Sequence, residues 1–253
     1  MTARLLGPVL VALGALALWE LVCRVFSVDP ALLPPPSSVM RAIVDDRGVL
    51  LPGLVTTATE AVAGLVVAAL LGGLFGVLIS QLRPVRVIGQ PLLVLSQTIP
   101  IIAIAPLLVT AFGFGVGPKI AVVTLIAVFP ITVAVTDGVR QADVAARELL
   151  RGTGAGRLAQ LRLLELPAAV PAIVSGARVA ALLVVPGAVA AEWVGATGGL
   201  GQQLLIYNND GRAVLSYACV MLLALLGLAL WLAVLLLDAA LTRRGLLGVD
   251  QAT

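Results

Sequence analysis

Long apolar segments separated by polar gaps constrain this chain more than any other feature. Six such runs occur, over residues 5–26, 54–80, 88–112, 116–136, 169–194 and 214–237. A helix needs about 20 mostly apolar residues to cross the hydrocarbon core of a bilayer. Because a spanning segment must satisfy its own backbone hydrogen bonds, the runs are expected to be helical. The sequence therefore predicts an all-α membrane protein with six transmembrane helices.

Composition supports a membrane protein and excludes several kinds of chemistry. Hydrophobic residues make up 60% of the 253 and charged residues 11%, which is too apolar for a soluble core of this length. Histidine is absent, which excludes His-based triads and most catalytic zinc sites. The two cysteines lack metal-ligand spacing, and a net charge of only +3 without a basic block argues against nucleic acid as a partner. We expect no catalytic residue, no metal site and no cofactor in this chain.

The basic residues predict how the chain is oriented in a membrane. Lysine and arginine concentrate in the cytoplasmic flanks of membrane spans. With the N-terminus inside, ten of the 16 basic residues fall on the cytoplasmic side and four, including Lys119, fall outside. The other two, Arg24 and Arg178, fall within spans or at their edges, and no arginine is expected in mid-span. This distribution predicts a multi-pass protein with both termini in the cytoplasm and with lipid as a partner.

Two long gaps indicate the domain organisation. In residues 27–53, a proline-rich stretch precedes Ser37, which is the predicted N-cap of an amphipathic outer helix. Residues 1–53 are therefore predicted to form the first transmembrane helix plus this outer segment. Residues 54–253 are predicted to form a five-helix core in one transmembrane domain. Within this core, the long polar gap over residues 138–168 is predicted to be cytoplasmic.

Small residues and glycines predict close packing and a tight turn. Ala68, Gly72 and Gly76 recur at four-residue spacing, which lets a second helix approach closely. Residues 113–117 read Gly-Phe-Gly-Val-Gly and predict a hairpin between two spans.

Three prolines interrupt the third run. Pro91, Pro100 and Pro106 occur within it, and Gln97 and Thr98 stand beside the middle one. Proline in a spanning helix frees carbonyl groups that only neighbouring protein or a water-filled cavity can satisfy. The pattern favours a helix that lines a pathway, and the alternative is a simple packing kink.

The gap over residues 138–168 carries the most specific pattern in the sequence. Its members, in order, are Glu148, Gly154, Leu164, Leu166 and Pro167. This pattern resembles the loop of ABC-importer permeases that reads E-A-A-x-x-x-G, nine further residues and I-x-L-P. Leucines replace both alanines and the isoleucine. The resemblance assigns these five residues, together with Arg157, to a coupling loop that contacts an ATPase.

The same segment can be interpreted without the family. Leu158, Leu161 and Leu164 give a short helix one apolar edge, with arginines elsewhere, which suits docking in a groove of a soluble partner. The alternative is an amphipathic helix lying on anionic lipid. Pro167 is expected to end this helix and to start the next span.

The resemblance extends over nearly the whole chain. Segments similar in form and order are 33–37, 97–100, 105–107, 112–115, 129–130, 191–196 and 199–201. They resemble the nitrate/sulfonate/taurine-type permeases, a group of binding-protein-dependent transport inner-membrane components, and most of all the branch that imports pyrimidine thiamine precursors or riboflavin. One departure is Glu60, where a basic residue is expected.

The resemblance implies the rest of the assembly. It implies a type I ABC-importer permease fold, with a cytoplasmic coupling loop between helices 4 and 5, in a bacterial inner membrane. The implied partners are two ATP-binding subunits, an extracytoplasmic substrate-binding protein and a second permease copy in a homodimer. The chain has no G-x-x-x-x-G-K-[ST] loop, so ATP and magnesium belong to the partner.

Candidate residues of the translocation pathway are Gln97, Thr98, Pro100, Glu192 and Trp193. An ionisable group such as Glu192 is costly within a bilayer and is usually functional, although at a helix end it can instead reach the headgroups. An acidic residue on the route favours a neutral or weakly cationic solute, and the best candidate is a hydroxymethylpyrimidine-type thiamine precursor. The alternatives are riboflavin, or sulfonate, taurine or nitrate, and more remotely a membrane scaffold without transport.

Overall fold

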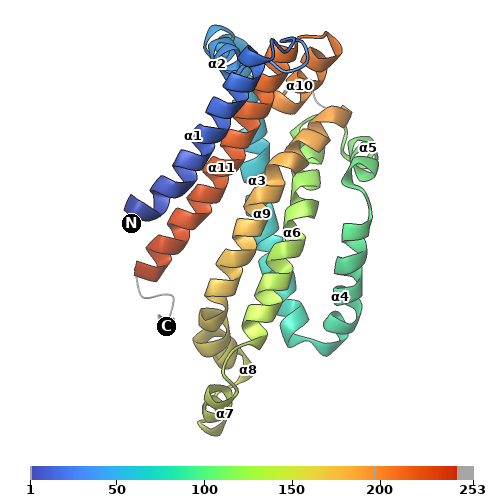
Figure 1. The fold of residues 1–253 in the computed structure, drawn as a ribbon. Coiled ribbons are helices and arrows are strands. Elements are labelled where there is room, and N and C mark those ends of the chain that lie inside the picture. Colours follow the sequence, from blue (N-terminus) through green and yellow to red (C-terminus); the bar gives the residue numbers. More distant parts are fainter. Residues whose placement is uncertain (1, 196–197, 244–253) are drawn as a thin grey trace. The chain divides into compact units, whose positions relative to one another are not determined.

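The chain is helical wherever it forms regular structure in the part that the computed structural model describes, residues 2–195 and 198–243 (Figure 1). The elements are α1 (Thr2–Val25), α2 (Pro36–Asp45), α3 (Arg47–Gln81), α4 (Arg83–Thr98), α5 (Ile101–Phe112), α6 (Val116–Arg140), α7 (Val144–Gly152), α8 (Arg157–Gln160), the π-helix η1 (Leu161–Glu165), α9 (Leu166–Gly195), α10 (Leu200–Asn209) and α11 (Ala213–Arg243). Ala196 of the 191–196 segment and Arg244 of the basic flank lie outside the described residues.

Four helical stretches are long and apolar enough to cross a membrane. They are Arg47–Gln81, Val116–Arg140, Arg157–Val194 and Ala213–Ala240, and a fifth is reached if the bent pair α4 and α5 counts as one span. The prediction of an all-α membrane protein is confirmed. Within the described residues the count of spans is four or five, whereas the sequence predicted six.

The chain divides into two compact units. The first comprises residues 1–57 and 197–224, which include α1, α2, α10 and the first parts of α3 and α11. The second comprises residues 58–196 and 225–253, which include the rest of α3, the helices α4 to α9 and the end of α11.

In the first unit, a carboxylate from α1 holds the start of α2. Pro35 occupies the N-cap position without a side-chain hydrogen bond, so the prediction that Ser37 is the N-cap is wrong. Two consecutive prolines set the entry to the helix, because their backbone φ already suits it. The backbone N–H and the hydroxyl of Ser37 instead donate to Glu20, at 3.0 and 2.8 Å. A negative charge is favourable at a helix N-terminus.

In the second unit, small residues bring α3 against α6. A Cβ atom at Gly76 would lie 2.5 Å from the Cβ of Val135, and Ala68 is fully buried. The hydroxyl of Thr136 donates to the carbonyl of Gly76 at 3.3 Å, and that of Thr124 donates to the carbonyl of Gly64 at the same distance. The predicted close-packing face of α3 is confirmed.

Helix α6 also packs along the length of α9, and the two run side by side in Figure 1. Gly138 lies against Ala169 and Ala172, and Gly176 lies against Ala134. Helix α6 therefore packs its β-branched side chains against glycines of α3, and packs its own small residues against small residues of α9.

The third apolar run is broken where the sequence predicted one span. The helix axis bends by 101° between α4 and α5, and Ile99 and Pro100 form the break. Proline lacks a backbone N–H and forces the preceding residue toward extended backbone, which Ile99 adopts with φ −85° and ψ 122°. The predicted hairpin after α5 is confirmed, with Gly113 and Gly115 at φ of +77° and +140°.

Pro167 does not end a helix, contrary to the prediction. Helix α8, the π-helix η1 and α9 are continuous from Arg157 to Gly195. The N–H of Leu166 donates to the carbonyl of Leu161, five residues back. The wider π-turn relieves the clash that a proline ring makes with a regular preceding turn, so the helix continues through Pro167.

Substitution of Gly76 by alanine tests the packing of α3 on α6. We expect Gly76→Ala to lower the free energy of unfolding by about 1–3 kcal/mol, because the methyl group would overlap Val135. Gly73→Ala is the matched control, since no atom lies within 4 Å of a Cβ at that position. Thermal unfolding in detergent measures both, and equal melting temperatures would contradict this packing.

Candidate functional site

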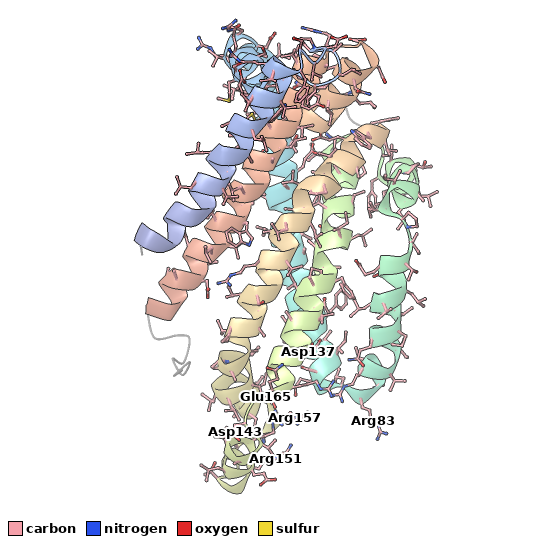
Figure 2. The ribbon with its side chains drawn as sticks, in the orientation of Figure 1. Arg83, Asp137, Asp143, Arg151, Arg157 and Glu165 are labelled. Atoms are coloured by element: carbon pink, nitrogen blue, oxygen red, sulfur yellow. The ribbon has the colours of Figure 1, made fainter. Side chains whose placement is uncertain are left out.

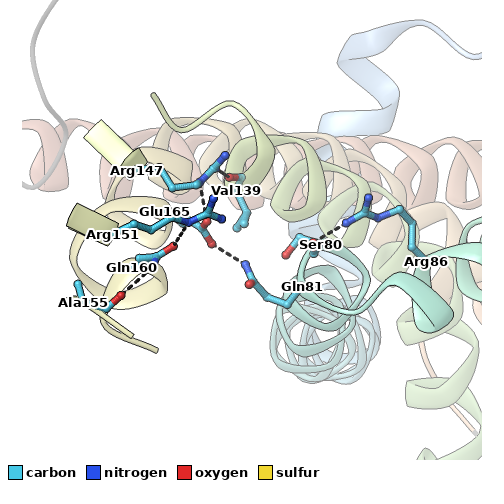
Figure 3. A network of polar contacts seen from close by, with 9 residues as sticks. All are labelled: Ser80, Gln81, Arg86, Val139, Arg147, Arg151, Ala155, Gln160 and Glu165. Carbon is cyan, nitrogen blue, oxygen red and sulfur yellow. Dashed lines mark hydrogen bonds and ion pairs between the residues drawn. The ribbon is translucent and has the colours of Figure 1, made fainter. Parts of the chain in front are cut away.

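Buried Glu165 binds polar side chains from two other helices (Figure 3). Its Oε1 accepts a hydrogen bond from Nε of Arg147 at 3.0 Å, and its Oε2 accepts one from Nε2 of Gln81 at 2.5 Å. Gln81 is the last residue of α3, Arg147 lies on α7 and Glu165 ends η1. The carboxylate therefore ties the segment 138–168 to the end of a membrane-spanning helix.

A second buried side chain, Gln160, closes the turn between α7 and α8. Its Nε2 donates to the carbonyl of Ala155 at 2.9 Å, and its Oε1 accepts from Nε of Arg151 at 3.4 Å. Gly154 lies in this turn with φ +82°, a conformation that favours glycine. The sequence analysis missed Glu165, Gln160 and Gln81. A signal for Glu165 was present, because a carboxylate stands between the two leucines at the end of the loop pattern.

The predicted coupling-loop residues occupy the surface of this segment or its edge. Glu148, Gly154, Arg157 and Pro167 are exposed, and Leu164 and Leu166 are half-buried. None of the six makes a side-chain hydrogen bond to the Glu165 network in the part of the chain that the structure describes. Leu149, Leu158 and Leu163 are also exposed, so the segment presents apolar as well as charged groups.

A buried charge cluster lies among α3, α6 and α9. Nζ of Lys119 lies 2.5 Å from Oε1 of Glu60. The carboxyl group of Glu192 lies close enough to that of Glu60 to interact with it both electrostatically and through a hydrogen bond. The exposed fractions are 4% for Lys119 and 1% for each glutamate. Glu192 therefore does not reach the headgroups, and Lys119, which the sequence analysis counted among the basic residues of the outer side, is buried. The family resemblance predicts a basic residue at position 60, which is Glu60 in this chain. Lys119 places a cation beside this position from another helix, α6.

A further ion pair lies between α9 and α11. Arg178 donates from its Nη2 to Asp238, and both side chains are partly exposed. Arg178 lies near the middle of α9, so the expectation that no arginine lies in mid-span is wrong. The paired carboxylate reduces the cost of an arginine at this depth.

The predicted pathway residues do not form one cluster. Gln97 and Pro100 line a mainly apolar cavity of about 290 Å³ at the break between α4 and α5. The hydroxyl of Thr98 donates to the carbonyl of Leu95, and Thr98 is not among the residues that line this cavity. Glu192 and Trp193 do not line it either, and Trp193 is 45% exposed.

The helical arrangement and the loop pattern agree with a known family. Residues 64–244 match the binding-protein-dependent transport system inner membrane component family. The chain belongs to this family. It is therefore a permease subunit of an ABC transporter, and its family works with ATP-binding and substrate-binding partners.

Similar proteins share the permease name and the fold. A probable ABC transporter permease protein from Haemophilus influenzae is 35% identical over 92% of this chain and 96% of its own length. The formylaminopyrimidine transport permease protein ThiX from Halalkalibacterium halodurans is 36% identical over 88% of this chain and 89% of its own length. The inward-facing MetNI methionine ABC transporter shares the fold, with a TM-score of 0.70 and 23% identity over 78% of this chain and 97% of the matched chain.

The cation of the buried cluster is expected to stabilise the permease. Lys119→Met would leave two buried carboxylates without their cation, and we expect it to lower the free energy of unfolding by about 3–5 kcal/mol. The double variant Lys119→Met/Glu60→Gln removes one of these carboxylate charges, so it should be less destabilised. Thermal unfolding of the purified variants measures both, and identical melting temperatures for the single and double variants would contradict the ion pairing.

Proposed function

We propose that this permease imports a small polar solute, and that the solute is a hydroxymethylpyrimidine-type thiamine precursor or a related heterocycle. The observation that carries the proposal is the 36% identity, over most of both chains, to a permease whose name specifies formylaminopyrimidine. Buried Glu192, which lies beside the Glu60–Lys119 ion pair, supports a neutral or weakly cationic solute. The alternatives remain riboflavin and, less compatible with this charge, sulfonate, taurine or nitrate.

The proposed assembly is a bacterial inner-membrane transporter. It comprises two copies of this chain as a homodimer, two ATP-binding subunits that hold ATP and magnesium, and one extracytoplasmic substrate-binding protein. Each copy crosses the membrane six times, with both termini in the cytoplasm. ATP-driven closure of the partner subunits switches the permease between inward- and outward-facing states.

We propose that residues 138–168 are the cytoplasmic coupling loop, located between the fourth and fifth spans. Exposed Leu149 and Leu158, flanked by arginines, suit a groove on the ATP-binding subunit. The contacts of Glu165 with Arg147 and Gln81 then pass a displacement of the loop to the end of α3.

Gly154 tests the coupling loop. Because its φ is +82°, a β-branched residue there is strained and would change the turn that presents α7 and α8. We expect Gly154→Val to reduce the amount of ATP-binding subunit that co-purifies with tagged permease by about tenfold. Gly152→Val is the control, since both glycines have open space around them and Gly152 lies in a regular helix. A wild-type permease that retains no ATP-binding subunit would refute the proposed contact.

Glu192 tests the route and the solute together. We propose that it faces the route when the helices around it separate during the transport cycle. We expect Glu192→Gln to reduce uptake of radiolabelled hydroxymethylpyrimidine by about tenfold in cells that express the complete transporter, because a charged hydrogen-bonding partner is lost. Co-purification of the ATP-binding subunit should stay unchanged. Unchanged uptake would remove Glu192 from the route, and a binding protein that takes flavin or sulfonate in calorimetry would replace the proposed solute.

A further inference from the structure

Five arginines line one small cavity in the second unit. It has a volume of about 230 Å³ and is lined by residues of α3, α4, α6 and the 138–168 segment, including the Glu165 network. The arginines are Arg86, Arg140, Arg147, Arg151 and Arg157. Figure 2 shows Arg151 and Arg157 together with Glu165 at this end of the helices. Positive side chains in this number repel one another unless an anion lies among them.

The protein supplies little negative charge to this cavity. Glu165 is the one carboxylate in its lining, and it already accepts hydrogen bonds from Arg147 and Gln81. Arg86 donates to the carbonyls of Ile79 and Ser80, which carry no net charge.

The nearby acidic residues lie outside the lining. Asp143 accepts the N–H of Ala145 and caps α7, whereas Asp137 and Glu148 are exposed. The cavity therefore holds five guanidinium groups and one carboxylate.

Two of the arginines are available to a ligand. Arg140 ends α6 and Arg157 begins α8, and both side chains are exposed. Neither guanidinium group makes a hydrogen bond or an ion pair with another residue in the part of the chain that the structure describes. Both residues line the same cavity from different helices, so a small anion in the cavity would lie close to both.

We propose that this cavity binds a phosphate group. A guanidinium group presents paired N–H donors in the geometry that matches phosphate oxygens, and a phosphate has enough oxygens to serve several arginines at once. The volume of about 230 Å³ lies below that of pockets for drug-sized ligands, which suits a single small headgroup or ion. The phosphate can come from an anionic lipid headgroup or from a free phosphate compound. The site is separate from the solute route and does not depend on which solute is carried.

Two probes distinguish the sources, and both use the purified full chain. Inorganic phosphate is titrated into the detergent-solubilised protein and followed by ³¹P line broadening at constant ionic strength. In parallel, the protein is reconstituted with phosphatidylglycerol or with phosphatidylcholine, and the retained lipid is counted by native mass spectrometry. Saturable phosphate binding indicates a free phosphate compound. Selective retention of phosphatidylglycerol indicates a lipid headgroup.

The variant Arg140→Gln/Arg157→Gln tests whether the cavity is the site. We expect it to weaken phosphate binding, or phosphatidylglycerol retention, by about tenfold or more, because two charge-assisted contacts are lost. Both side chains are exposed and have no hydrogen-bond or ion-pair partner among the described residues, so the fold should be unaffected. The control is Arg83→Gln/Arg162→Gln, which removes the same charge from exposed positions outside the lining. The proposal is overturned if neither probe binds, or if the control weakens binding as much as the cavity variant.

Discussion

The close approach of α3 to α6 places a buried ion pair and two hydroxyl hydrogen bonds within the second unit. Lys119 pairs with Glu60 across 59 positions in the chain, and the same offset relates Val123 to Gly64, Ile131 to Gly72 and Val135 to Gly76. A constant offset means that the two helices run parallel in a single register. A small residue at each turn, Gly64, Ala68, Gly72 and Gly76, allows this approach, because a larger side chain there would push the helices apart. The buried ion pair therefore follows the same helix register as the glycine contacts.

The packing of α3 on α6 also helps to stabilise this ion pair in its apolar surroundings. Separating Lys119 from Glu60 would require α3 to slide along α6, and the contacts at Gly72 and Gly76 oppose that movement. The pair in turn disfavours a slip in register, because a slip would leave buried charges without partners. Apolar packing and the ion pair therefore specify the same alignment.

Local patterns in the sequence predicted the features that depend on local physics. The apolar runs predicted the helices, the four-residue spacing of Ala68, Gly72 and Gly76 predicted the α3 face, and the glycines at 113–117 predicted a hairpin. Local sequence patterns gave a wrong prediction where a residue far away in the sequence determines the hydrogen bonding. Ser37 was predicted to be an N-cap from its residue type and position alone. The sequence near it does not show that Glu20, on another helix, accepts the hydrogen bonds of that helix end.

In the candidate site, too, local patterns predicted some features, whereas contacts between residues distant in the sequence were not predicted. Spacing identified the loop 138–168, yet its structural centre, Glu165, became visible only once α3 and α7 were brought beside it. The pairing of Lys119 with Glu60 was not predicted for the same reason, since nothing near Lys119 in the sequence reveals Glu60. Pro167 misled in another way, because a π-turn is a rare accommodation that local propensity does not indicate.

The uninterrupted helix from Arg157 to Val194 has a mechanical consequence. Glu165 lies near one end and Glu192 near the other, separated by about 40 Å at 1.5 Å per residue. A proline hinge at position 167 would have let the loop swing without disturbing the membrane segment. The π-turn instead makes residues 157–166 continuous with the span, so a tilt of this helix at Glu165 would also displace its far end beside the buried cluster.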